Sequence, residues 1–169
     1  DWEVIKSRIR FLVVSCECYY IFLDHITALV SGDASGDERK QLDYIMTELA
    51  SLVQELGCTI FYISHLTTPD NGSKPHEEGG RVKLRQFRGS RAIGQWSWFV
   101  FGMERDQQAK DEKVRHTTTF RVLKDRYTGQ AAGEVFYIGY NAKTGKMYET
   151  EAPDSDAGAD FEDETGGDF

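Results

Sequence analysis

The chain has 169 residues, 40% of them hydrophobic, which is enough apolar material for one medium-sized domain with a core. No apolar run reaches the roughly 18 to 20 residues of a membrane span, and no signal sequence opens the chain, so we expect a cytoplasmic protein outside the membrane. The net charge is -8, but nine of the 28 acids lie from Glu149 onward, where Lys and Arg are absent. This distribution predicts a nearly neutral folded body, residues 1–148, and an acidic tail, residues 149–169.

The first half of the chain alternates helix and strand. Apolar residues at helical spacing predict a helix over 2–14, and the apolar run 18–23 predicts a strand. The clearest helical pattern covers 38–56 and is ended by Gly57, and a second apolar run, 58–64, predicts another strand. Strand, helix and strand in this order predict a parallel pair with a right-handed crossover. Because both apolar runs are continuous, we expect strands buried on both faces.

The second half adds further strands. Apolar and β-branched residues predict strands at 98–103, 117–124 and 134–138, followed by a turn at 141–146 and a short last strand. The predicted fold class is therefore α/β with a mainly parallel twisted sheet flanked by helices. We expect the acidic tail to be disordered, because it has few large apolar groups and much like charge. The three cysteines are expected to be buried free thiols.

Polar side chains stand at the ends of the first two predicted strands. Asp24 ends "YYIFLD" and His65 ends "FYISH". Since ligands of parallel sheets bind beyond the carboxyl ends of the strands, Asp24 is a candidate Mg²⁺ ligand and His65 a candidate donor to a phosphate oxygen. The alternatives are an aspartate that caps the next turn and a histidine that contacts a loop carbonyl.

Two basic stretches follow. The basic segment, residues 81–91, carries cations and no acid, which suggests phosphate contacts or only a solvated face; its cations are Arg81, Lys83, Arg85, Arg88 and Arg91. Gly89 and Gly94 are expected to make its backbone pliable. Arg126 ends the strand in "FRVLKDRYTG", where it can project toward a neighbouring subunit or form a surface salt bridge.

Taken in order, several stretches resemble the helicase half of phage primase-helicases, ring-shaped replicative helicases with a RecA-like ATPase core that are related to bacterial DnaB. They are "YYIFLDHITALVSG", "DERKQLDYIMTEL", "ISHLTTPDNGSKPHEEG", "FRGSRAIGQWSWFVFGMERDQQ" and "LKDRYTG". The resemblance covers essentially the whole chain. It implies a DNA helicase that uses ATP or dTTP with Mg²⁺, moves 5'-3' on single-stranded DNA and assembles as a homo-oligomer, expected to be a hexamer.

The resemblance also implies roles for residues. Asp24 matches the Walker B aspartate, His65 the histidine that senses the terminal phosphate, and Arg126 the arginine finger for the adjacent subunit. Gln95, Arg105 and Lys124 match further positions near the nucleotide.

DNA contacts are implied for the loop after His65 and for the basic segment. The loop has only one lysine where phage relatives have several. The implied DNA-binding residues are Thr67, Thr68, Asn71, Ser73, Lys74, Arg81, Lys83, Arg85 and Arg88. Arg91 stands where the family pattern has glycine.

The chain contains no G-x-x-x-x-G-K-[ST] phosphate-binding loop, so we expect a partial catalytic domain that does not hydrolyse nucleotide alone. In the phage family an acidic tail recruits the replicative DNA polymerase, which would place Asp168 and Phe169 at that contact; a merely solubilising terminus is the alternative. A non-catalytic RecA-like scaffold and a RecA-like recombinase remain alternative functions. The retention of Asp24, His65, Gln95 and Arg126 together favours the helicase.

Overall fold

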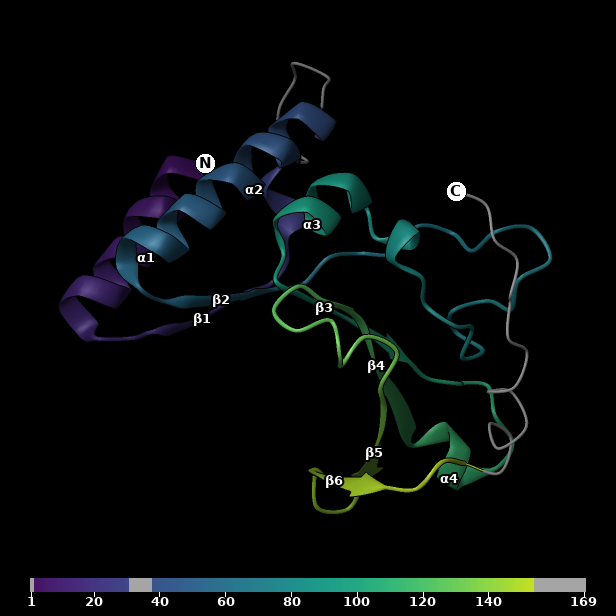
Figure 1. Ribbon diagram of the computed structural model, residues 1–169. Helices are drawn as coiled ribbons and strands as arrows, with labels where there is room; N and C mark the ends of the chain where they lie inside the picture. Colours follow the sequence, from purple (N-terminus) through teal and green to yellow (C-terminus); the bar gives the residue numbers. More distant parts are fainter. Residues whose placement is uncertain (1, 31–37, 154–169) are drawn as a thin grey trace. The chain divides into compact units, whose positions relative to one another are not determined.

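The computed structural model describes residues 2–30 and 38–153 (Figure 1). The chain divides into two compact units, unit 1 with residues 1–67 and 83–100, and unit 2 with residues 68–82 and 101–169. Among the described residues, no helix is long and apolar enough to cross a membrane.

Unit 1 combines helices with a two-stranded parallel sheet (Figure 1). In chain order its elements are α1 (Trp2–Cys16), β1 (Tyr20–Leu23), η1 (Ile26–Leu29), α2 (Glu38–Leu56), β2 (Thr59–Tyr62), η2 (Leu84–Gln86) and α3 (Ser90–Trp96). The two long helices and both strands of the parallel pair lie where the sequence pattern predicts them, within a few residues at their ends. The short helix α3, which begins at the end of the basic segment, was not predicted.

The core of unit 1 forms because apolar residues recur every three or four positions on the two long helices. The buried side chains of α1 and α2 are Trp2, Ile9, Val13, Leu42, Ile45, Met46, Leu49 and Leu52. They cluster with Ile21 of β1 and Ala92 of α3, so the helical stripe holds one face of the strand pair in place.

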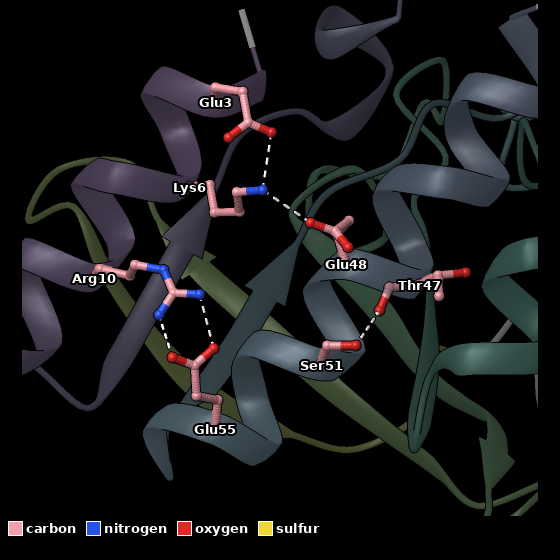
Figure 2. Close-up of polar contacts among 7 residues, drawn as sticks. All are labelled: Glu3, Lys6, Arg10, Thr47, Glu48, Ser51 and Glu55. Atoms are coloured by element: carbon pink, nitrogen blue, oxygen red, sulfur yellow. Dashed lines mark hydrogen bonds and ion pairs between the residues drawn. The ribbon is translucent and has the colours of Figure 1, made fainter.

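Ion pairs join α1 to α2 (Figure 2). Lys6 Nζ lies 2.8 Å from Glu3 and 2.9 Å from Glu48, and these hydrogen bonds raise the pKa of Lys6. Arg10 forms a two-pronged pair with Glu55, which lowers the pKa of that carboxyl. Both cations are on α1, and Glu48 and Glu55 are on α2, so the contacts fix the register of one helix along the other.

Two predictions about burial are wrong. The parallel pair is open on the face away from the core, where Phe22 is 77% and Phe61 42% exposed and their rings stack at 4.8 Å between centroids. A continuous apolar run therefore does not mean burial on both faces here. Likewise, Cys16 and Cys18 are exposed and only Cys58 is buried.

The second sheet has four strands in the order β3 (Phe99–Glu104), β4 (Thr117–Asp125), β5 (Val135–Asn141) and β6 (Lys146–Thr150), with the short helix α4 (Glu112–Arg115) between β3 and β4. The pairs β4–β5 and β5–β6 are antiparallel. The α/β class is thus confirmed, but the expectation of a mainly parallel sheet is wrong. The connections of these pairs, 126–134 and 142–145, are shorter than the roughly twelve residues that a parallel crossover needs. Strand β6 includes Glu149 and Thr150, which the sequence assigned to the tail.

Candidate functional site

The candidate site in unit 1 lies at the carboxyl ends of the parallel strands. Leu23 pairs with Tyr62 in the β1–β2 register. Beyond the strands, the Ile63 amide donates to Leu23 O at 3.0 Å and the Ile26 amide donates to Ile63 O at 2.9 Å. Asp24 and His65 therefore follow strands that end at the same edge of the sheet, as the sequence predicts.

A second histidine, His25, contacts His65 at this edge. The two rings lie 4.0 Å apart between centroids and are tilted by 36°. The Ala28 amide donates to His25 Nδ1 at 3.1 Å, and Thr27 Oγ1 lies 2.6 Å from the same nitrogen. Because Nδ1 accepts a hydrogen bond, the ring proton of neutral His25 belongs on Nε2. Sequence reasoning gave His25 no role, although its position directly behind Asp24 was a usable signal.

The segment after β2 is held by the basic segment. Leu66 and Phe87 form an antiparallel bridge. The Arg88 amide donates to His65 O at 2.8 Å, and the Thr67 amide donates to Gln86 O at 2.7 Å. The backbone of His65 is consequently fixed from the side as well as from its own strand. Gln86, which is buried and was not singled out from the sequence, supplies the carbonyl for Thr67.

The candidate metal ligand is one carboxylate. Asp24 is exposed, and no group of three or more His, Cys, Asp or Glu side chains suited to a metal occurs among the described residues. A single carboxylate fits Mg²⁺, which commonly binds through one or two carboxylates, water and substrate phosphates, better than a metal that needs an all-protein cage.

Helix α3 carries Gln95, which is exposed. The C-terminal end of this helix is anchored by Ser97, whose hydroxyl donates to Ile93 O at 2.7 Å and hydrogen-bonds the Tyr62 hydroxyl. Burial raises the pKa of Tyr62. Since Tyr62 belongs to β2, this contact ties the helix of Gln95 to the strand that precedes His65.

The remaining candidate nucleotide residues lie in unit 2. Arg105 follows β3, and its Nε donates to Arg115 O at 2.7 Å. Lys124 and Arg126 stand at the end of β4, where burial and then the charge of Arg126 lower the pKa of Lys124. Arg126 itself is exposed. Asp125, between these two cations, is buried and was not identified from the sequence.

All nine predicted DNA-binding residues are exposed. They are divided between the units: Thr67, Lys83, Arg85 and Arg88 are in unit 1, and Thr68, Asn71, Ser73, Lys74 and Arg81 are in unit 2. Lys74 Nζ lies 3.4 Å from Asp106, and Arg88 lies 2.8 Å from Glu38. These exposed pairs leave the cations accessible to solvent.

The start of the basic segment is fixed by a buried carboxylate. Glu104 accepts a hydrogen bond from the Val82 amide at 2.8 Å and pairs with Arg121 at 3.1 Å. The predicted tail contact, Asp168 and Phe169, lies outside the described residues.

The sequence of the whole chain, rather than its site, resembles a known protein. No protein-family model matches the chain. Over 162 residues, 96% of the chain, it is 35% identical to the DNA helicase/primase of Enterobacteria phage T3. The chain is therefore similar to this phage helicase/primase along nearly its whole length. The resemblance carried by the sequence motifs is thereby confirmed. The chain spans 27% of the length of this relative.

Proposed function

We propose that the chain is part of a replicative DNA helicase with a RecA-like core. In this proposal the complete protein couples hydrolysis of ATP or dTTP to 5'-3' movement on single-stranded DNA and unwinds duplexes as a ring. The relationship along nearly the whole chain to a protein named DNA helicase/primase carries the proposal. Asp24 and His65 follow paired strands that end at one sheet edge, which supports the assignment of the nucleotide site.

Each residue of that edge has a chemical role in the proposal. Asp24 would hold Mg²⁺, and the ion would supply positive charge against the phosphates when bound. His65 is proposed to donate a hydrogen bond to the terminal phosphate, and Gln95 is proposed to contact the same group. Because the backbone of His65 is bonded to Arg88, a change at the phosphate can move the basic segment that is proposed to bind DNA.

The cations of unit 2 serve the neighbouring subunit in this proposal. Charge develops on the transferred phosphoryl group, and an arginine placed against it lowers the barrier. Arg126 is the proposed finger, Lys124 assists it, and Arg105 contacts nucleotide. The exposure of Arg126 at the end of β4 is what an intersubunit contact requires.

The first test is nucleotide hydrolysis by the complete protein, with and without single-stranded DNA. Arg126→Ala is expected to lower DNA-stimulated turnover about 10³-fold or more, because loss of an arginine finger has effects of this size. Arg8→Ala, which removes an exposed arginine of α1, is the matched control and should retain wild-type turnover.

Two outcomes would contradict the proposal. A folded wild-type protein that neither hydrolyses ATP or dTTP nor unwinds DNA would favour the non-catalytic scaffold. DNA-stimulated strand exchange without unwinding would favour the recombinase.

The DNA contacts are tested by salt dependence. Each phosphate contact on single-stranded DNA contributes about 0.7 to the slope of log K against log salt. A triple alanine variant of Arg81, Lys83 and Arg85 is therefore expected to lower the slope of the complete protein by about 2. A charge-matched control replaces three exposed cations elsewhere, Arg8, Arg39 and Lys143. Equal slopes for the triple variant and the wild type would exclude the basic segment as the DNA contact.

The acidic tail is proposed to recruit a replicative DNA polymerase through charge and one terminal aromatic ring, that of Phe169. Deleting Phe169 should weaken polymerase binding while hydrolysis is retained. Unchanged binding would leave the tail as a solubilising terminus.

A further inference from the structure

The turn after β4 is built around the carboxylate of Asp125. Its Oδ1 accepts hydrogen bonds from the amides of Tyr127 at 2.9 Å and Thr128 at 3.0 Å. Its Oδ2 accepts from Thr128 Oγ1 at 2.5 Å and from the Ala131 amide at 3.2 Å. An ionised carboxylate offers about four lone-pair sites, so the donors of the turn occupy this one fully.

The protonation state agrees with this geometry. The pKa of Asp125 is lowered to about 2, first by the hydrogen bond from the Thr128 hydroxyl and then by the amides of the turn. Asp125 is therefore ionised throughout the neutral range, and its four acceptor positions persist there.

The bonds of Asp125 enclose Arg126. The residue before Arg126 ends β4, and the two residues after it are bonded to the Asp125 carboxylate. The far end of the loop is pinned as well, because the Gly133 amide donates to Val122 O at 2.8 Å and the Val122 amide donates to Glu134 O at 2.9 Å. The backbone of Arg126 is thus fixed on both sides while its side chain is exposed.

A salt bridge is the ordinary role of an acid between two cations, and it does not describe this carboxylate. The donors on Asp125 are three amides and one hydroxyl of its own turn. The carboxylate therefore stabilises the backbone conformation of the turn 125–131 instead of pairing with a cation.

We propose that Asp125 is a positioning residue for Arg126, a role that rests on the proposed function of Arg126 as an arginine finger. The carboxylate holds the turn 125–131 in the one shape that presents the guanidinium to the neighbouring subunit's nucleotide. Asp125 touches neither nucleotide nor Mg²⁺ in this role.

The test uses the complete protein and measures DNA-stimulated hydrolysis. Thr128→Val removes the hydroxyl that bonds Oδ2 and leaves the charge of the turn unchanged, whereas Thr128→Ser keeps the hydroxyl. Asp125→Asn removes the acceptor at one oxygen. Since misplacement of a reacting group by about 1 Å can lower rates about 100-fold, we expect Asp125→Asn and Thr128→Val to lower kcat about 10- to 100-fold with KM little changed. Thr128→Ser should retain wild-type kcat.

A double variant separates positioning from general stability. If Asp125 acts through Arg126, then Asp125→Asn combined with Arg126→Ala should be no slower than Arg126→Ala alone. Losses that multiply in the double variant would overturn the proposal, as would a wild-type kcat in Asp125→Asn when Arg126→Ala has lost turnover. If Arg126→Ala keeps full turnover, the proposed finger fails and the positioning role fails with it. Thermal unfolding of each variant shows that the folded fraction is unchanged.

Discussion

Among the described glycines of unit 1, Gly89 is the one at which an added methyl group should disturb the fold most. It precedes α3 with φ 84°, and a Cβ there would lie 1.9 Å from Leu42 Cδ2 in the core. The left-handed backbone costs a residue with a Cβ about 1 to 2 kcal/mol, and forcing an extra carbon into a packed core costs about 1 to 3 kcal/mol. Gly89→Ala should therefore lower the free energy of unfolding by about 2 to 5 kcal/mol.

Gly57→Ala is the matched control. Gly57 also has a positive φ, 62°, but nothing lies within 4 Å of its added Cβ. This variant carries only the backbone strain of about 1 to 2 kcal/mol, so the difference between the two variants isolates the collision with Leu42. Urea unfolding followed by tryptophan fluorescence measures the effect in unit 1, because Trp2, Trp96 and Trp98 all belong to it.

A third variant tests the cause. Leu42→Ala alone should cost about 2 to 5 kcal/mol as a cavity in the core. Combined with Gly89→Ala it should cost less than the sum, because the new methyl group then has room. Equal effects of Gly89→Ala and Gly57→Ala, or strict additivity with Leu42→Ala, would refute the close-approach argument.

Two further predictions concern charge. The pKa of Asp125 is lowered to about 2 from its ordinary 3.8, so its turn stabilises the fold fully above about pH 4 and loses this contribution as the pH falls through about 2. Asp125→Asn should therefore flatten the acid limb of stability between about pH 4 and 2, measured by urea unfolding with circular dichroism; an unchanged limb would contradict the assignment. For Arg10 and Glu55, which are both substantially exposed, a double-mutant cycle should give a small coupling that shrinks between about 0.1 M and 1 M salt. A coupling independent of salt would show that the pair acts through packing.

The placement of Asp24 and His65 could be predicted because it depends only on strand order. Two apolar runs joined by a long amphipathic helix can form a parallel pair, and a parallel pair brings both carboxyl ends to one edge. The exposed face of the same pair could not be predicted. Phe22 and Phe61 are apolar yet exposed. A continuous apolar run does not show whether one or both faces of a strand are buried.

Glycine shows the same limit. From the sequence, Gly89 suggests a pliable backbone beside Arg88. In the structure the Leu42 side chain packs closely against the backbone of Gly89 and occupies the place where a Cβ would lie. The sequence shows that a glycine has conformational freedom, but it does not show which neighbouring side chain leaves no room for a Cβ.

The residues that sequence reasoning missed share one property, since each accepts hydrogen bonds from backbone amides. The backbone carbonyl of Gln86 accepts a hydrogen bond from the Thr67 amide, and the carboxylate of Asp125 accepts hydrogen bonds from amides of its turn. Every residue except proline has a backbone amide, so the sequence does not show which amides donate to a side chain. The motif therefore points to Arg126 but not to the Asp125 carboxylate, which accepts hydrogen bonds from the turn around it.

The division of the candidate residues between the two units agrees with the proposed chemistry. Asp24, His65 and Gln95 belong to unit 1, whereas Arg105, Lys124 and Arg126 belong to unit 2. If the arginine serves a neighbour's nucleotide, it need not meet the Asp24 of its own chain. What such a residue needs is a rigid base, because a flexible arginine would lose entropy each time it enters the neighbouring site. The fully hydrogen-bonded turn of Asp125 supplies that base. If the proposed ring forms, variants of the turn should therefore affect its catalysis more than folding of the single chain.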